Sequence, residues 1–243
     1  MYLDPAETAA WVWAVAKIAK THPAIRSGLI ELFVLPSLPA LPLTIDLLAS
    51  TPIRVGAQDL HWDDRGAATG GVSGTDLRQL GCRYVEINHA ERRQVFAESP
   101  TIAARKLAAA IRNDLTPIVC IGEQVRDSSN IAAAHCIAQL EQLLVLAPAE
   151  IPRLIVAYEP EWAIGASASA DAGHVRAVGA ELAAFLAHRS DIRSADLLYG
   201  GSAGPGLLPR LGTSVDGLFL GRFAHDPGNL QQVLDEAAAT AGV

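Results

Sequence analysis

Seven short apolar runs, separated by stretches with helical periodicity, constrain the fold more than any other feature of this sequence. Each run has the length of a strand and the apolar character of a strand that is buried on both faces. The runs span residues 29–35, 53–57, 83–87, 117–121, 154–158, 196–199 and 217–220. Strands that alternate with helices imply a parallel sheet covered by helices. Since no linker or low-complexity stretch interrupts this order, we expect one α/β domain over residues 1–243.

The helical stretches carry their own signals. Asp4 is placed to cap a first helix with Pro5 in its first turn and Glu7 at its third position, and this helix should end near His22 and Pro23. Apolar residues at helical spacing predict one buried face on each of three helices: Trp11, Ala14, Val15 and Ile18; Val175, Val178, Leu182, Phe185 and Leu186; Leu230, Val233 and Leu234. The pattern gives seven strands and about eight helices, and no strand precedes the first helix.

Composition excludes several classes of protein. Half of the 243 residues are apolar, which rules out a disordered chain and a small disulfide scaffold. The net charge of −7 argues against nucleic acid or an anionic membrane as a partner. No run is long enough to span a membrane and no basic signal peptide opens the chain, so we expect a cytoplasmic protein. Three widely spaced cysteines, Cys82, Cys120 and Cys136, are expected to be buried free thiols.

Polar residues follow the apolar runs directly, and this is where parallel α/β folds collect their chemistry. The segments are Gln58-Asp59, Asn88-His89-Ala90-Glu91-Arg92-Arg93, Gly122-Glu123, Glu159-Pro160-Glu161-Trp162-Ala163-Ile164-Gly165, Gly200-Gly201-Ser202 and Gly221-Arg222. Because the carboxyl ends of parallel strands share one edge of the sheet, these side chains should point into one mouth.

Two of these residues are candidates for acid–base chemistry. Glu159 leaves a buried strand, where burial would raise the pKa of its carboxyl towards that of a useful base; the alternative is a surface glutamate at a strand end. His89 suits the role of a neutral electrophile or acid, or of a polar residue satisfied by nearby backbone. Glu91, Arg92 and Arg93 also fit a structural ion-pair cluster.

Glycine-bearing turns follow the last three strand ends. Isolated glycines usually form tight turns, but their grouping here favours a backbone cradle for a phosphate, since glycine lets N–H groups approach an anion closely. No pair of cysteines or histidines has the spacing of metal ligands, so we expect no metal site.

These motifs resemble the triosephosphate isomerase family over nearly the whole chain. The nine residues 157–165 are similar to that family's segment of catalytic glutamate and closing lid, with Glu161 in place of an apolar residue. Residues 88–93 resemble its histidine segment, although glycine and serine are more usual where Asn88 and Ala90 stand. The remaining matches are Tyr199-Gly200-Gly201-Ser202, Cys120-Ile121-Gly122-Glu123, and Ala57-Gln58 with Thr69-Gly70.

The resemblance implies a TIM (β/α)8 barrel and a set of roles. Glu159 would move a proton between the carbon atoms of a ketose and an aldose, and a neutral His89 would polarise the enediolate oxygens. Glu91 of the histidine segment joins them as a third catalytic candidate. The backbone N–H groups of Gly165, Ser202, Gly221 and Arg222 would bind phosphate, residues 160–168 would close over it, and no cofactor is needed.

One departure concerns the N-terminus. The family opens with a strand ending in Asn-x-Lys, whose lysine neutralises the developing negative charge, and here Met1 aligns just after that lysine. The barrel is therefore expected to be incomplete, with seven strands and the first missing. The three lysines, Lys17, Lys20 and Lys106, fall in predicted helices. Either an upstream strand belongs to the natural protein, or the gap closes by rearrangement or by pairing with another chain.

Three functions follow from the resemblance. The default is interconversion of dihydroxyacetone phosphate and glyceraldehyde 3-phosphate, the triose step of glycolysis and gluconeogenesis, impaired by the absent lysine. Residues 58–62 and 216–222 are more similar to the branch of the family that acts on four-carbon erythrulose phosphates. A non-catalytic protein that binds phosphorylated ligands is the third.

The resemblance also implies a homo-oligomer, most simply a dimer. In this family the loop corresponding to residues 61–72 inserts beside the partner's active site, and Thr69 is the position carried over to that contact. A solvent-exposed glycine-rich loop is the alternative.

Overall fold

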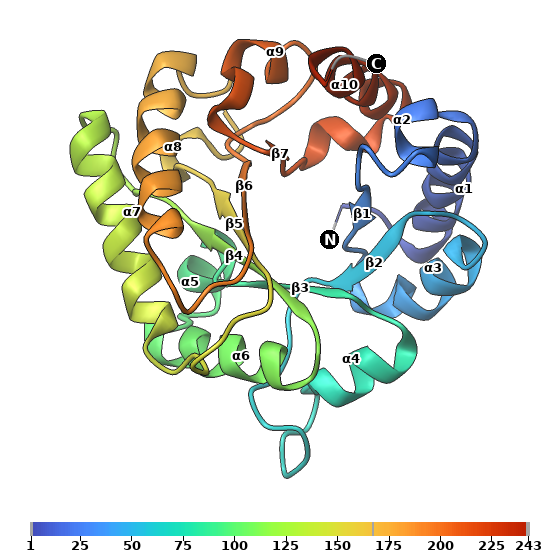
Figure 1. The fold of residues 1–243 in the computed structure, drawn as a ribbon. Coiled ribbons are helices and arrows are strands. Elements are labelled where there is room, and N and C mark those ends of the chain that lie inside the picture. The colour runs from blue at the N-terminus through green and yellow to red at the C-terminus, as the bar shows by residue number, and fades with distance from the viewer. Residues whose placement is uncertain (1, 167, 242–243) are drawn as a thin grey trace.

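A computed structural model describes residues 2–166 and 168–241 and places the seven expected strands in one parallel sheet. Strands that follow one another in the chain are neighbours in the sheet, in the order β1 to β7. The sheet curls into a ring of strands with helices around its outside (Figure 1). The strands are β1 (Phe33–Val34), β2 (Arg54–Ala57), β3 (Tyr84–Ile87), β4 (Thr116–Ile121), β5 (Leu154–Tyr158), β6 (Ala195–Tyr199) and β7 (Gly217–Leu218).

Helices precede, separate and follow the strands in the chain, and they cover the outer face of the sheet (Figure 1). No helix among the described residues is both long and apolar enough to cross a membrane. The helices are α1 (Pro5–Thr21), α2 (Pro23–Arg26), α3 (Leu41–Leu48), α4 (Gly74–Leu80), α5 (Ala90–Val95), α6 (Pro100–Arg112), α7 (Ser129–Leu144), α8 (Ala172–Ala187), α9 (Leu208–Leu211) and α10 (Pro227–Thr240), with 3-10 turns at Leu38–Ala40, Glu161–Ala163, Gly212–Ser214 and Arg222–His225.

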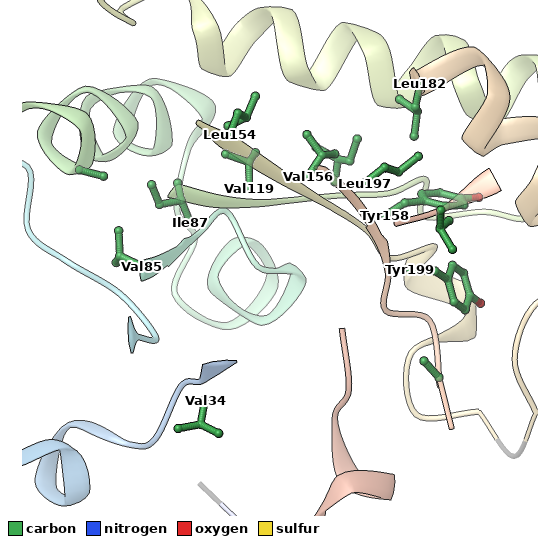
Figure 2. Packing of buried hydrophobic residues seen from close by; sticks show 14 of the residues in the cluster. Val34, Val85, Ile87, Val119, Leu154, Val156, Tyr158, Leu182, Leu197 and Tyr199 are labelled. Atoms are coloured by element: carbon green, nitrogen blue, oxygen red, sulfur yellow. The ribbon is translucent and has the colours of Figure 1, made fainter. Parts of the chain in front are cut away.

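The alternation of side chains along each strand divides the core into two layers. One set of strand residues packs against the helices, among them Val85, Ile87 and Val119 (Figure 2). The other set faces the interior of the ring and forms a separate apolar cluster: Tyr84, Ile118, Cys120, Ile155, Ala157 and Leu198. All three cysteines are buried and free, as expected.

Helix α1 begins as its sequence predicts but buries a different face. The Asp4 side chain accepts from the backbone N–H of Glu7, and the Glu7 carboxylate accepts from that of Asp4, which completes a capping box. The buried residues are Thr8, Val12, Val15, Ala16 and Ala19, so the predicted face of Trp11, Ala14, Val15 and Ile18 is rotated. The indole N–H of Trp11 donates to the carbonyl of Ala224 at 2.7 Å. This bond holds the large indole ring at the side of the helix. The small side chains of Ala16 and Ala19 lie on the buried face instead.

Strands β1 and β7 stand at the two ends of the sheet, and each is two residues long. Within residues 2–166 and 168–241, no strand pairs with the outer edge of either one. Backbone hydrogen bonds between described residues therefore leave the ring open between β7 and β1. Met1, on which the N-terminal alignment rests, lies outside the described residues.

Candidate active site

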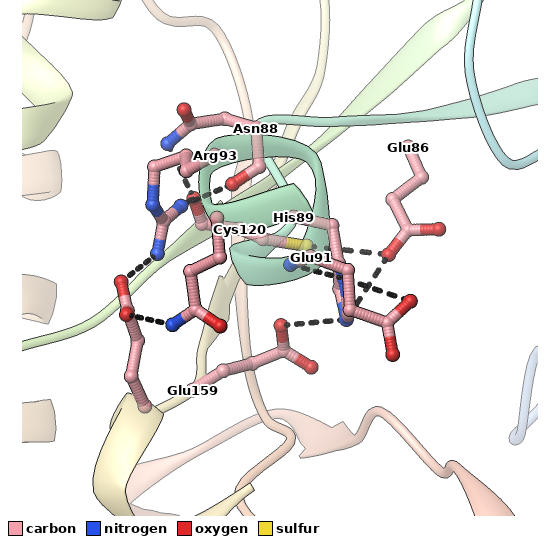
Figure 3. Close-up of polar contacts among 9 residues, drawn as sticks. Glu86, Asn88, His89, Glu91, Arg93, Cys120 and Glu159 are labelled. Atoms are coloured by element: carbon pink, nitrogen blue, oxygen red, sulfur yellow. Dashed lines mark hydrogen bonds and ion pairs between the residues drawn. The ribbon is translucent and has the colours of Figure 1, made fainter. Parts of the chain in front are cut away.

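The polar residues that follow the strands converge at the carboxyl ends of β3 and β5. Glu159 comes directly after β5, and His89 comes two residues after β3. Oε2 of Glu159 lies 3.5 Å from Nε2 of His89 (Figure 3). The fold thus brings together two candidate acid–base residues that are seventy positions apart in the sequence.

Glu159 is a buried carboxylate at the end of a buried strand, with 5% of its surface exposed. Two glycines make room for it: a Cβ on Gly200 would stand 2.4 Å from Oε1 of Glu159, and a Cβ on Gly122 would clash with the Glu159 carbonyl. Oε2 has no hydrogen-bond partner among the described residues. Burial raises the pKa of Glu159, and the neighbouring His89 opposes that rise only in part. The surface-glutamate alternative is therefore excluded.

His89 is held by the backbone around it. It caps α5, and its Nδ1 accepts from the backbone N–H of Glu91 at 3.2 Å, which leaves the proton of a neutral ring on Nε2, towards Glu159. Burial lowers the pKa of His89, but the carboxylates of Glu86, Glu159 and Glu91 raise it, and the net direction is upward. The backbone bond favours the neutral ring that the family resemblance implies, whereas the surrounding carboxylates favour the protonated one.

Asn88 explains how this turn forms without the usual glycine. Its φ of 65° lies in the left-handed region, which asparagine tolerates better than most residues. Its side-chain amide donates to the carbonyl of Cys120 in β4 at 2.8 Å. The bond fastens the end of β3 to its neighbour and so orients His89.

Glu91 is placed differently from the other two catalytic candidates. Its carboxylate is exposed and lies 4.0 Å from Nδ1 of His89, on the side of the ring away from Glu159. The ion pairs of the adjacent arginines do not involve Glu91. Arg92 pairs with Asp59 and Glu98, and Arg93 pairs with Glu161.

The segment that is expected to act as a lid is anchored at its base by a buried glutamate. Glu123, which follows β4, accepts from the indole N–H of Trp162 at 2.8 Å and from the hydroxyl of Tyr158 at 3.2 Å. The Glu161 carboxylate accepts hydrogen bonds from Nη2 of Arg93 at 2.5 Å and from the side-chain amide of Gln94 at 2.6 Å. The substitution of an apolar residue by Glu161 thus ties the start of the lid to α5, the helix that His89 caps.

The four expected phosphate-binding residues lie around the lid. The hydroxyl of Ser202 donates to the carbonyls of Ala163 and Ala166, and Nη2 of Arg222 donates to the carbonyl of Gly165 at 3.0 Å. Ser202 has a φ of 53°. The backbone N–H groups of Gly165, Ser202, Gly221 and Arg222 donate no hydrogen bond within the described part of the chain. Ser167, part of the expected lid, lies outside the described residues.

One charged residue in the site comes from within a strand. Glu86 of β3 is buried, and its Oε1 lies 3.9 Å from Nε2 of His89 and 3.6 Å from the thiol of Cys120 (Figure 3). Burial raises the pKa of Glu86 to about 7. Because Glu86 lies inside a strand and not after its end, it was not among the residues predicted from the sequence. The available signal was a carboxylate inside an otherwise apolar run, where burial is costly.

Among the described residues, no group of three or more histidine, cysteine or acidic side chains is arranged to hold a metal ion. Lys106 in α6 is buried and pairs with Asp59 at 2.6 Å and Glu98 at 2.5 Å, and it forms no ion pair with Glu159.

Comparison with known proteins agrees with the fold. A model of the family described as triosephosphate isomerase matches residues 1–237. The chain is 48% identical to the L-erythrulose-1-phosphate isomerase of Pectobacterium atrosepticum, over 98% of this chain and 92% of that protein. It is 39% identical to the triosephosphate isomerase of Moorella thermoacetica, over 84% of this chain and 85% of that protein.

A solved structure has the same fold. The crystal structure of triosephosphate isomerase from Bartonella henselae aligns with a TM-score of 0.80 and 28% identity, covering 97% of this chain and 94% of that one. The seven parallel strands are thus those of a TIM barrel, and the chain belongs to the triosephosphate isomerase family of isomerases.

Proposed function

We propose that this protein isomerises a small phosphorylated sugar by moving a proton between adjacent carbon atoms, with Glu159 as the base. The observation that carries the proposal is the buried carboxylate of Glu159, whose Oε2 lies 3.5 Å from Nε2 of His89 and lacks a hydrogen-bond partner among the described residues. A base with a raised pKa beside a hydrogen-bond donor suits the formation of an enediolate.

The substrate that we favour is a four-carbon ketose phosphate. The relative named L-erythrulose-1-phosphate isomerase is 48% identical over 98% of the chain, whereas the triosephosphate isomerase of Moorella thermoacetica is 39% identical over 84%. Residues 58–62 and 216–222 support the same branch. Triose phosphate, the default from the sequence, is the second candidate, since the family and the solved relative carry that name.

The proposed proton transfer uses Glu159 as the base and His89 as the hydrogen-bond donor. Glu159 removes the proton from C3 of L-erythrulose 1-phosphate, and the C3–H electron pair forms a C2–C3 double bond while the carbonyl electrons move to O2. Nε2–H of His89 hydrogen-bonds the enediolate oxygens and relays a proton between them. Glu159 then returns its proton to C2, and the carbonyl forms at C3. Atoms and electrons balance without an external oxidant or reductant.

The backbone around the lid supplies phosphate binding. Four N–H groups, those of Gly165, Ser202, Gly221 and Arg222, have no acceptor in the described part of the chain and are available to an anion. The Arg222 guanidinium, already bonded to the Gly165 carbonyl, adds a positive charge at the same place. Closure of the lid excludes water, so that the enediolate does not lose its phosphate.

We expect turnover to be slow, because the described residues place no lysine or arginine in an ion pair with Glu159. Within residues 2–166 and 168–241, the only such contact of Glu159 is His89. A cation at this point would stabilise the enediolate. A version extended by a strand ending in Asn-x-Lys, assayed beside the 243-residue chain, tests this expectation through recovery of kcat.

We also expect a homodimer. The loop of residues 61–72 projects from the barrel between β2 and α4 (Figure 1). It is shaped by a bond from the backbone N–H of His61 to the carbonyl of Val72, at 2.7 Å, and Thr69 in this loop is exposed. Light scattering at micromolar concentration tests this expectation, and a monomer contradicts it.

An isomerase assay tests the proposed function. Purified protein is incubated with L-erythrulose 1-phosphate and, separately, with dihydroxyacetone phosphate, and the products are followed by NMR. We expect turnover of the four-carbon substrate that Glu159→Gln abolishes. A higher kcat/KM for dihydroxyacetone phosphate would make the triose phosphate the substrate. Binding of either phosphate with no turnover, even in the extended version, would leave a non-catalytic binding protein.

A further inference from the structure

Glu86 is a charged side chain in the apolar interior of the barrel. Its neighbours Val85 and Ile87 face the helices, and Tyr84, on the same side as Glu86, belongs to the apolar cluster inside the ring. The alternation of β3 therefore directs Glu86 inward, next to Cys120 of β4. A carboxylate in such a place costs free energy unless a partner compensates it.

The partners within the chain are weak. The Cys120 thiol is a poor donor at 3.6 Å, and Nε2 of His89, at 3.9 Å, is beyond hydrogen-bond distance. In the part of the chain that the structure describes, no lysine or arginine lies within 4.0 Å of Glu86, and the charged groups that act on it are His89, Glu159 and Glu91. The Glu86 carboxyl thus lies close to His89 and can still accept hydrogen bonds from a further partner.

The sheet order gives the position of Glu86 relative to the proposed phosphate-binding residues. The proposed phosphate donors follow β5, β6 and β7, Glu159 follows β5, and Cys120 and Glu86 belong to β4 and β3. Around the ring the order is phosphate site, proton-transferring carboxylate, then Glu86. Figure 3 shows His89 contacting both Glu159 and Glu86. The end of the substrate opposite its phosphate therefore faces Glu86.

The two candidate substrates differ at that end. In L-erythrulose 1-phosphate, the carbon that loses its proton carries a hydroxymethyl group, where dihydroxyacetone phosphate carries hydrogen. We propose that Glu86 determines specificity: its carboxyl hydrogen-bonds the terminal hydroxyl of a four-carbon ketose phosphate, and a triose phosphate leaves it unpaired. This inference rests on the proposed function. A site that hydrogen-bonds a substrate hydroxyl discriminates against an analogue without it, because the buried group is then left unsatisfied.

The protonation behaviour of Glu86 agrees with a hydroxyl partner. Burial raises its pKa to about 7, so both forms are populated at neutral pH. A hydroxyl donates to the carboxylate and accepts from the carboxylic acid, so it pairs with either form. A cationic partner would pair with the carboxylate only.

Three variants test the assignment. Glu86→Leu replaces the carboxyl by an apolar group in apolar surroundings, and Glu86→Gln keeps a hydrogen-bonding group of the same shape. Glu31→Gln is the matched control, because Glu31 contacts Tyr84 and Arg153 away from the catalytic pair. Circular dichroism checks that each variant folds. The measurements are kcat/KM for both phosphates, and the Kd of each phosphate by calorimetry.

We expect Glu86→Leu to lower the ratio of kcat/KM for the four-carbon substrate over the triose about 10- to 100-fold, and Glu86→Gln to change it less than about threefold. Glu31→Gln should leave kcat/KM unchanged for both substrates. An equal loss for both substrates would make Glu86 a positioning residue that acts through His89 and would overturn the proposal, as would unchanged values. If the wild type turns over neither phosphate, the proposed function fails, and a preference in Kd that Glu86→Leu removes would still support selection by Glu86.

Discussion

Two buried clusters of charge in this molecule are built in opposite ways. In the first, the ammonium group of Lys106 lies within 2.6 Å of the carboxylates of Glu98 and Asp59. Arg92 forms ion pairs with the same two carboxylates. In the second, at the barrel mouth, Glu159 and Glu86 have His89 as their only basic contact within 4.0 Å among the described residues. The first cluster holds loops and α6 together. The second leaves carboxylates uncompensated, and this is where chemistry becomes possible.

Glu159→Gln tests the mouth cluster with the largest expected effect. The amide cannot accept the substrate proton, so kcat should fall by about 10³-fold. Because the change removes a buried charge without a strong partner, the free energy of unfolding should stay the same or rise. Steady-state kinetics measures the change in kcat, and urea denaturation measures the change in the free energy of unfolding. Full activity would remove Glu159 from the mechanism.

Lys106→Met tests the paired cluster, where the effect should fall on stability. The change leaves the buried carboxylate of Glu98 and the partly exposed carboxylate of Asp59 with less positive charge, at a cost of about 3 kcal/mol in the free energy of unfolding. Urea denaturation measures it, with the exposed Lys17→Met as control. The kcat of the folded variant should not change. A fall in kcat with unchanged stability would reverse the distinction between the clusters.

The pH dependence of stability separates the clusters further. Below pH 4.5 Glu86 is protonated in both the folded and the unfolded chain, whereas above its folded pKa of about 7 it is ionised in both and the folded state bears the burial cost. Its contribution to stability therefore falls as pH rises through this window. Between pH 5 and pH 7 the wild type should lose about 2 kcal/mol relative to Glu86→Leu. Parallel stability profiles for the two proteins would mean that Glu86 carries no such cost.

Arg222→Ala should have the smallest effect, because this charge is exposed and its one bond goes to the Gly165 carbonyl. Phosphate is held mainly by backbone N–H groups in the proposed site, so KM should rise about threefold while kcat changes little. Phosphate affinity measured by calorimetry checks this. An unchanged affinity would exclude Arg222 from phosphate binding.

Much of the fold follows from the sequence because its signals are local. Apolar runs bounded by turns located all seven strands, and the Asp4 cap located the start of α1. The two short strands were overestimated: residues 29–35 contain β1 of Phe33–Val34, and residues 217–220 contain β7 of Gly217–Leu218. Pairing with a neighbour decides where such strands end, and β1 and β7 each have a partner on one side only within the described residues.

The site was predictable where residues follow strands and unpredictable where partners are distant. Glu159 and His89 meet as expected, because parallel strands end at one edge. The pairing of Glu161 with Arg93 joins residues 68 positions apart and has no local signal. The face of α1 depends in the same way on the contact of Trp11 with Ala224. Glu86 did have a sequence signal, since it is a carboxylate within an apolar run. The candidates came only from the residues after each run, so they did not include Glu86.

Deuterium exchange tests most directly whether Glu159 takes a proton from a phosphorylated sugar. L-Erythrulose 1-phosphate in deuterium oxide is followed by proton NMR with wild type, Glu159→Gln and Glu31→Gln. We predict loss of the C3 proton signal with wild type and Glu31→Gln, and retention of the signal with Glu159→Gln. Equal exchange in Glu159→Gln and wild type, or no exchange by wild type with either the four-carbon or the triose phosphate, would contradict the assignment of Glu159 as the base.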